Sequence, residues 1–114
     1  MFKHETEHLD EHMMMIQCNL DDMNPEYVPH VTDLLFEAGA NDVYWTPIIM
    51  KKGRPGMMLN VLAAQNLQGE MEQIIFRETT TLGLRYWPVT CHRLARKIVQ
   101  VATEWGPVDV KTAY

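Results

Sequence analysis

The sequence is poor in cysteine, in long apolar runs and, over its first half, in basic residues. Its 114 residues include two cysteines, Cys18 and Cys91, too few for a disulfide framework or a four-thiolate metal site. No apolar run approaches the roughly 18 residues that a membrane span needs, so no membrane partner is expected. The first twelve residues are acidic where a secretory leader is basic and then apolar. We therefore expect a cytoplasmic protein.

The composition is that of an ordinary globular domain, with 46% hydrophobic and 22% charged residues. The formal net charge of −5 conceals an asymmetry, because all but one of the lysines and arginines lie after residue 50 and most acids lie before it. Such a pattern suggests a charged ligand, although attraction between the two halves of one fold is an alternative. The acidic total argues against a generic nucleic-acid binder.

Residues 1–12 are polar, without an apolar period, and predict a flexible acidic lead-in. His4, His8 and His12 recur every four residues. On a helix they would align and allow a neighbouring pair to bind a divalent ion. The alternative is a polar linker in which the spacing is accidental.

Apolar residues alternate over 13–20 and predict a half-buried strand. A helix is expected to follow, with Asn24 at its N-cap and Gly39 as its stop. Pro29 removes one helical donor. It therefore predicts a helix that begins late or is bent.

The later part of the chain continues the alternation of strands and helices. Strands are expected at 43–50, 57–64 and 84–89, and a second helix at 67–77. The resulting order predicts an α+β, ferredoxin-like fold, in which two split βαβ units form a four-stranded antiparallel sheet with two helices on one face. The expected domains are the lead-in at 1–12, the ferredoxin-like domain at 13–92 and a C-terminal β-hairpin at 93–114, the start of a second small subdomain.

Two charged segments follow predicted strands. Asp21 and Asp22 are hard oxygen ligands suited to Mg²⁺ or Mn²⁺, or alternatively favour the N-terminus of the next helix. Lys51, Lys52 and Arg54 lie on a glycine-containing connection that suits phosphate oxygens. The alternative for these cations is a solvated hairpin loop.

Two further groups fit a nucleotide or are simply structural. Residues 79–81 with Gly83 offer hydroxyls and amides to an anion, or end a helix. Stacking on a base and packing in the sheet are the two alternatives for the three tryptophans, Trp45, Trp87 and Trp105. The two charged segments together would describe a metal–nucleoside triphosphate site, although no P-loop, dinucleotide fingerprint, serine elbow or zinc HExxH motif occurs.

Four blocks in order resemble the C-terminal domain of the nickel insertion protein family, which makes the nickel-pincer nucleotide cofactor of lactate racemase. The blocks are NLDDMNPE at 19–26, FEAGANDV at 36–43, TPIIMKKGRPG at 46–56 and RETTTLGLR at 77–85. The resemblance extends from about residue 19 to residue 111. It implies that this chain acts as part of a longer protein, beside the family's large N-terminal domain.

The resemblance implies a CTP-dependent cyclometallase, a lyase-type nickel chelatase. Such an enzyme inserts nickel into a pyridinium bis-thiocarboxylic acid mononucleotide and cleaves CTP to CMP and pyrophosphate, with Mn²⁺ or Mg²⁺. A homo-oligomer is also implied. The competing hypothesis is a non-catalytic ferredoxin-like module for oligomerisation or small-molecule sensing.

The resemblance also implies which residues of this chain form the site, namely those at the positions that match the family's motifs. They are Asp21 and Asp22 for the divalent metal, Lys51, Lys52 and Arg54 as catalytic and phosphate-binding residues, and Glu78, Thr79, Thr80 and Arg85 for the nucleotide pocket.

Overall fold

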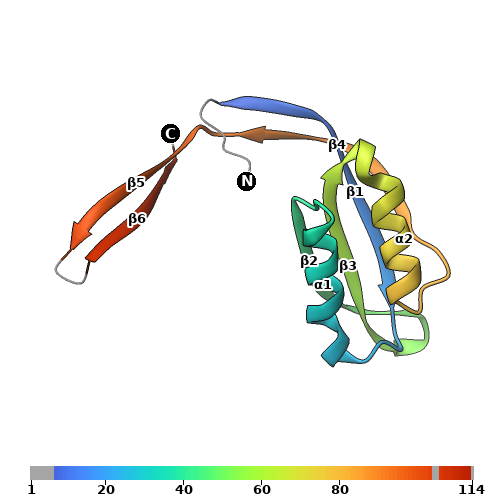
Figure 1. Cartoon of the computed structure of the whole chain (residues 1–114). Helices are drawn as coiled ribbons and strands as arrows, with labels where there is room; N and C mark the ends of the chain where they lie inside the picture. Colours follow the sequence, from blue (N-terminus) through green and yellow to red (C-terminus); the bar gives the residue numbers. More distant parts are fainter. Residues whose placement is uncertain (1–6, 104–105, 114) are drawn as a thin grey trace. The chain divides into compact units, whose positions relative to one another are not determined.

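The computed structural model describes residues 7–103 and 106–113 (Figure 1). The chain divides into two units, His12–Val89 and the combination of Met1–Glu11 with Thr90–Tyr114. The domain boundaries expected from the sequence stay predictions. Within the described ranges, no helix is long and apolar enough to span a membrane.

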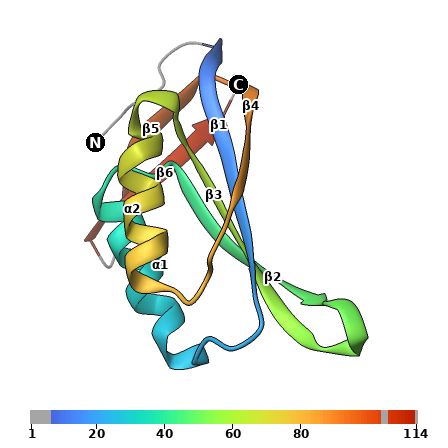
Figure 2. The ribbon, with the colours of Figure 1, turned by 90° about the vertical axis from the view of Figure 1, so that its right-hand side faces the viewer.

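The main sheet has four strands in the order β2-β3-β1-β4. They are β1 (His8–Leu20), β2 (Asp42–Ile49), β3 (Pro55–Ala64) and β4 (Arg85–Arg93). β3 pairs antiparallel with both β1 and β2. The helices α1 (Val28–Glu37) and α2 (Gln68–Glu78) lie on the same face of the sheet (Figures 1 and 2). This arrangement confirms the predicted α+β, ferredoxin-like fold.

β1 begins at His8, five residues before the predicted strand. The expectation of an irregular lead-in is therefore wrong for residues 8–12. His8 and His12 lie on a strand, so the helical alignment of histidines is also wrong, and His4 lies outside the described residues. Polarity misled the prediction because this part of the strand is largely exposed.

Charged side chains accompany the start of β1 within the unit formed by the chain ends. The Arg93 Nε donates to Asp10 Oδ2 at 2.6 Å, and His92 pairs with Glu7. β5 (Arg96–Thr103) and β6 (Gly106–Ala113) form the expected antiparallel hairpin. The third tryptophan, Trp105, lies outside the described residues.

The first helical segment begins in two steps. Asn24 Oδ1 accepts the Glu26 N–H at 3.0 Å and caps the short 3₁₀ turn η1 (Pro25–Tyr27). α1 follows, with Pro29 in its first turn, where a missing N–H leaves no helical bond unmade. Gly39 ends the segment with φ of 109°, a conformation that favours glycine. The predicted cap, late start and stop are confirmed.

The core lies between the sheet and the two helices. Its fully buried members include Ile16, Cys18, Leu59, Val61, Val31, Leu35, Met71 and Ile75. Burial raises the pKa of the Cys18 thiol to about 11, so the thiol stays protonated at neutral pH. Cys18 is therefore a packing residue, as the alternation of β1 predicted.

Candidate functional site

Three connections meet at one end of the sheet: the loop after β1, the turn between β2 and β3, and the loop after α2. The register explains part of this arrangement, because Leu20 at the end of β1 pairs with Met57 near the start of β3. Arg54 immediately precedes β3 and therefore comes close to the loop after β1. Figure 2 shows the β2–β3 turn projecting beyond the end of β1.

The two aspartates contact the other two connections directly. Asp21 Oδ2 lies 3.8 Å from Arg54 Nη1, and their side chains are 34% and 65% exposed. Thr80 Oγ1 donates to Asp22 Oδ1 at 2.5 Å. The helix-capping alternative does not account for these carboxylates, because Asn24 provides the cap.

The basic turn has an unusual backbone. The Met50 N–H donates to the Arg54 carbonyl at 2.6 Å and closes the turn. Lys52 adopts φ of 63° and ψ of 20°, the left-handed region that costs a side-chain-bearing residue about 1–2 kcal/mol. In the described part of the chain, neither Lys51 nor Lys52 has a carboxylate within ion-pair distance. Both ammonium groups are therefore available to an anion.

The donor set suits a divalent metal that is shared with phosphate. No cluster of three or more metal-ligating side chains occurs within the described ranges. Mg²⁺ commonly binds one or two carboxylates together with substrate phosphates. Asp21 and Asp22 fit that requirement, but they do not form a cage that would hold a metal alone.

The threonines after α2 have different roles. The Thr79 hydroxyl donates to the Ile75 carbonyl at 2.7 Å and accepts the Thr81 N–H at 3.3 Å. Thr79 therefore closes the helix end, while Thr80 extends toward the aspartates.

Glu78 has three side-chain partners. Its Oε1 accepts the Tyr27 hydroxyl at 3.2 Å and lies 3.1 Å from His30 Nε2, while its Oε2 accepts Arg77 Nε at 2.8 Å. The hydrogen bond from Arg77 is the largest cause that lowers the pKa of Glu78. The bond to Glu78 raises the pKa of Tyr27, because it stabilises the protonated phenol. None of these contacts joins Glu78 directly to another predicted site residue.

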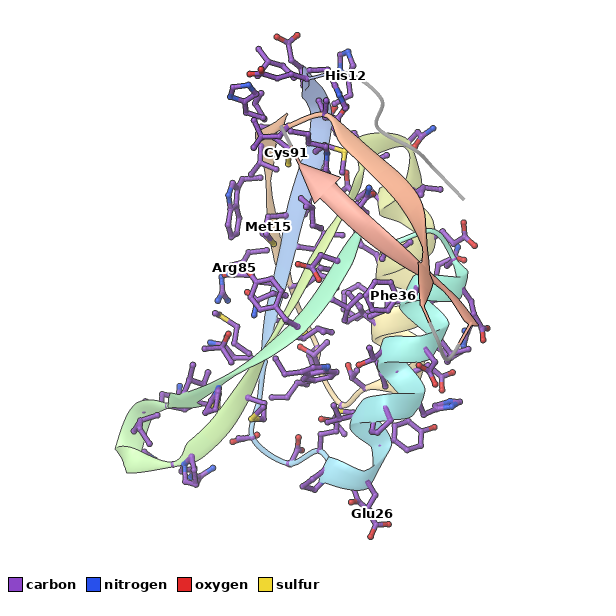
Figure 3. All side chains as sticks on the ribbon, turned by 90° about the vertical axis from the view of Figure 1, so that its left-hand side faces the viewer. His12, Met15, Glu26, Phe36, Arg85 and Cys91 are labelled. Atoms are coloured by element: carbon purple, nitrogen blue, oxygen red, sulfur yellow. The ribbon has the colours of Figure 1, made fainter. Side chains whose placement is uncertain are left out.

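Arg85 is held on the opposite face of the sheet. Figure 3 shows Arg85 and Met15 on the side away from α1 and α2. Arg85 donates to Gln17 Oε1 and Asn19 Oδ1, each at 3.2 Å. No described carboxylate pairs with this guanidinium. The structure thus separates Arg85 from the loop contacts of the other predicted residues.

A buried amide supports that face. Asn60 is 1% exposed, and its Oδ1 accepts Gln17 Nε2 at 2.7 Å. Its Nδ2 is within hydrogen-bond distance of the Tyr44 carbonyl, Thr46 Oγ1 and the Met58 carbonyl, at 3.1–3.3 Å. The sequence signal for this residue was a single amide within an apolar strand.

A pocket of about 280 Å³ opens beside Asp21. Its walls include Leu20, Met23, Val28, Trp45 and Met57. Trp45 Nε1 donates to Thr32 Oγ1 at 2.8 Å, which fixes the indole orientation. This mostly apolar space is near the lower limit for small-molecule sites and is large enough for one aromatic ring.

The chain matches a known family over its whole length. Residues 1–114 match the family described as nickel insertion protein. The pyridinium-3,5-bisthiocarboxylic acid mononucleotide nickel insertion protein of Acetivibrio thermocellus is 45% identical over 107 residues, 94% of this chain and 26% of that protein. The protein of that name from Clostridium acetobutylicum is 45% identical over 104 residues, 91% of this chain and 25% of that protein. The chain thus spans about a quarter of the length of these relatives.

Solved structures agree with the sequence comparisons. The C-terminal domain of a cyclometallase involved in the synthesis of the NPN cofactor of lactate racemase has a TM-score of 0.86 and 40% identity. The alignment covers 96% of this chain and 74% of that one. A protein from Methanopyrus kandleri, with a TM-score of 0.70 and 22% identity, shares the fold.

Proposed function

Because the chain belongs to the nickel insertion protein family, we propose that it is the CTP- and metal-binding C-terminal domain of a nickel-inserting cyclometallase. The proposed substrate is a pyridinium bis-thiocarboxylic acid mononucleotide, and the product is the nickel-pincer cofactor of lactate racemase. The observation that carries the proposal is the meeting of two carboxylates, a basic turn and a threonine loop at one end of the sheet.

Asp21 and Asp22 would bind Mn²⁺ or Mg²⁺ through carboxylate oxygens. When bound, the metal neutralises charge on the triphosphate and thereby favours its cleavage to CMP and pyrophosphate. Lys51, Lys52 and Arg54 bind the phosphates and stabilise negative charge that develops on their oxygens, which is the catalytic role that we assign to them. The exposed pair of Asp21 with Arg54 is weak, so Arg54 can exchange it for a phosphate at small cost.

The rest of the nucleotide lies near the loop after α2. Thr80 is the residue of this loop that contacts the aspartates, and we assign it to direct contact with the nucleotide. In this proposal Glu78 and Thr79 support the loop through their internal hydrogen bonds, and Arg85 lies apart on the other face of the sheet. We place the base in the pocket beside Asp21, where Trp45 offers an aromatic wall. A pocket of this size favours a single-ring pyrimidine over a purine.

The complete reaction extends beyond this chain in our proposal. Nickel is the inserted ion and therefore a substrate. The N-terminal domain of the same protein supplies the rest of the machinery, and the assembly is a cytoplasmic homo-oligomer. A modest single-domain core, which oligomerisation would stabilise, supports the assembly.

Calorimetric titration tests the nucleotide site. The chain is titrated with CTP, ATP, GTP and UTP, each with Mn²⁺ and again with a chelator. We expect metal-dependent binding that is strongest for CTP. A chain that assembles but binds none of the four nucleotides would instead support the non-catalytic oligomerisation or sensing module.

A pair of double variants tests the basic turn. Lys51→Ala/Lys52→Ala should weaken Mn²⁺·CTP binding about 100-fold, because each charged hydrogen bond contributes about 1.5 kcal/mol. Lys51→Arg/Lys52→Arg retains both charges and should bind within about fivefold of the wild type. Unchanged affinity in the alanine variant would remove the phosphate assignment.

A further inference from the structure

Glu78 lies at a position that disfavours a carboxylate. It is the last residue of α2, and the C-terminus of a helix carries partial negative charge. The side chain is nevertheless only 15% exposed. Arg77 compensates its charge, and Tyr27 and His30 lie within hydrogen-bond distance of its Oε1. Such convergence on an unfavourably placed acid indicates a specific structural task.

The partners of Glu78 connect two segments of the proposed site. The loop after β1 carries Asp21 and Asp22 and is called the aspartate loop below. Tyr27 and His30 follow this loop within a few residues, and their rings lie 4.9 Å apart. Glu78 itself precedes Thr80 by two residues. The hydrogen bond from Thr80 to Asp22 joins the same two segments a second time. The two links together form a closed ring of contacts.

We infer that Glu78 is a positioning residue, which acts through Tyr27 and His30 to hold the aspartate loop against the loop that carries Thr80. The link fixes the distance between Thr80 and Asp22. The carboxylate faces internal partners, which also keeps its negative charge from facing the phosphates. The coupling of the loops stands on the contacts alone, whereas its effect on nucleotide binding rests on the proposed function.

Amide hydrogen exchange tests the coupling without nucleotide. In the full chain, Glu78→Ala should speed exchange at least tenfold at Glu26 and Tyr27, whose N–H groups bond Asn24, and at Thr81. The control is Glu70→Ala, which removes an exposed acid from the first turn of the same helix. It should leave those amides unchanged. Faster exchange confined to residues 77–79, or equal changes in both variants, would overturn the inference.

A double-mutant cycle measures the effect on the proposed site. Glu78→Ala should weaken Mn²⁺·CTP binding about tenfold. Its effect should be non-additive with Thr80→Val, because Glu78 acts through the Thr80 loop. The control pair is Glu78→Ala with Lys51→Ala. Their effects on affinity should multiply, because Lys51 lies on the turn between β2 and β3 and not on either of the two loops that Glu78 links. Multiplicative effects with Thr80→Val as well would refute the positioning role.

A conservative variant distinguishes a positioning role of Glu78 from a direct role of its negative charge at the site. Glu78→Gln retains an oxygen that accepts hydrogen bonds from Tyr27 and His30, so it should retain affinity within about threefold of the wild type. If it loses as much affinity as Glu78→Ala, the carboxylate charge itself acts at the site, and the positioning role is wrong. If the wild-type chain binds no nucleotide, the proposed function fails, while the exchange measurements still decide the coupling.

Discussion

Replacing Asn60 with Asp changes one amide nitrogen into an oxygen at a fully buried position. The change removes the Nδ2 donor from the Tyr44 carbonyl, Thr46 Oγ1 and the Met58 carbonyl. An amide has two hydrogens, which together form about two hydrogen bonds of about 1 kcal/mol each. Burying a charged carboxylate beside carbonyl oxygens is costly, so the side chain takes up a proton, which at pH 7 costs about 4 kcal/mol for an ordinary pKa of about 3.9. The protonated carboxyl keeps one O–H donor, so about one hydrogen bond is lost. We therefore expect Asn60→Asp to lower the free energy of unfolding by about 4–6 kcal/mol.

Urea denaturation followed by circular dichroism measures this loss. The midpoint should fall with an unchanged slope, because the surface exposed on unfolding is the same. Asn41→Asp makes the same chemical change at an exposed position and should alter stability by no more than about 0.5 kcal/mol. A loss below 1 kcal/mol for Asn60→Asp would refute the reasoning from its hydrogen bonds.

Three further predictions concern the site end of the fold. Lys52→Gly should leave the free energy of unfolding within about 0.5 kcal/mol, because relief of the left-handed backbone offsets the added chain entropy, while calorimetry shows weaker Mn²⁺·CTP binding. Gly56→Ala should destabilise the chain by about 1–3 kcal/mol in urea, because the new Cβ would lie 2.8 Å from the Leu20 carbonyl oxygen. Hydrogen bonding from Arg77 lowers the pKa of Glu78, so its contribution to stability is present above the ordinary value of 4.5 and is lost as the pH falls through the lowered value. Acid titration of thermal stability should show that loss in the wild type, and a loss of equal size in Glu78→Gln would contradict the assignment.

The order of elements could be predicted because local signals agreed with the tertiary fold. Alternation in β1, the cap at Asn24 and the stop at Gly39 each act within a few residues. The start of β1 was not predictable in this way. Residues 8–12 extend β1, and Asp10 contacts the distant Arg93 of β4. Their polar side chains carry no local strand signal.

The candidate site was predictable as a set of segments but not as a set of contacts. The fold type places the C-terminal ends of β1 and α2 at the same end of the sheet, and this brings Asp22 and Thr80 together. Side-chain partners depend on angles and distances that spacing does not specify. The three contacts of Glu78, from Tyr27, His30 and Arg77, were therefore missed. Arg85 belongs to a matching motif, yet its side chain lies on the other face of the sheet (Figure 3).

The charge asymmetry of the sequence allowed two explanations, and the described contacts support each in part. Some cations of the second half pair with acids of the first half, as Arg93 does with Asp10 and Arg54 does with Asp21. Lys51, Lys52 and Arg85 have no such partner among the described residues. Internal attraction would predict compensation throughout, whereas the two lysines of the β2–β3 turn have no ion-pair partner among the described residues. A metal–phosphate ligand would satisfy these lysines and the two aspartates at once, because the carboxylates bind its cation and the lysines bind its anionic oxygens.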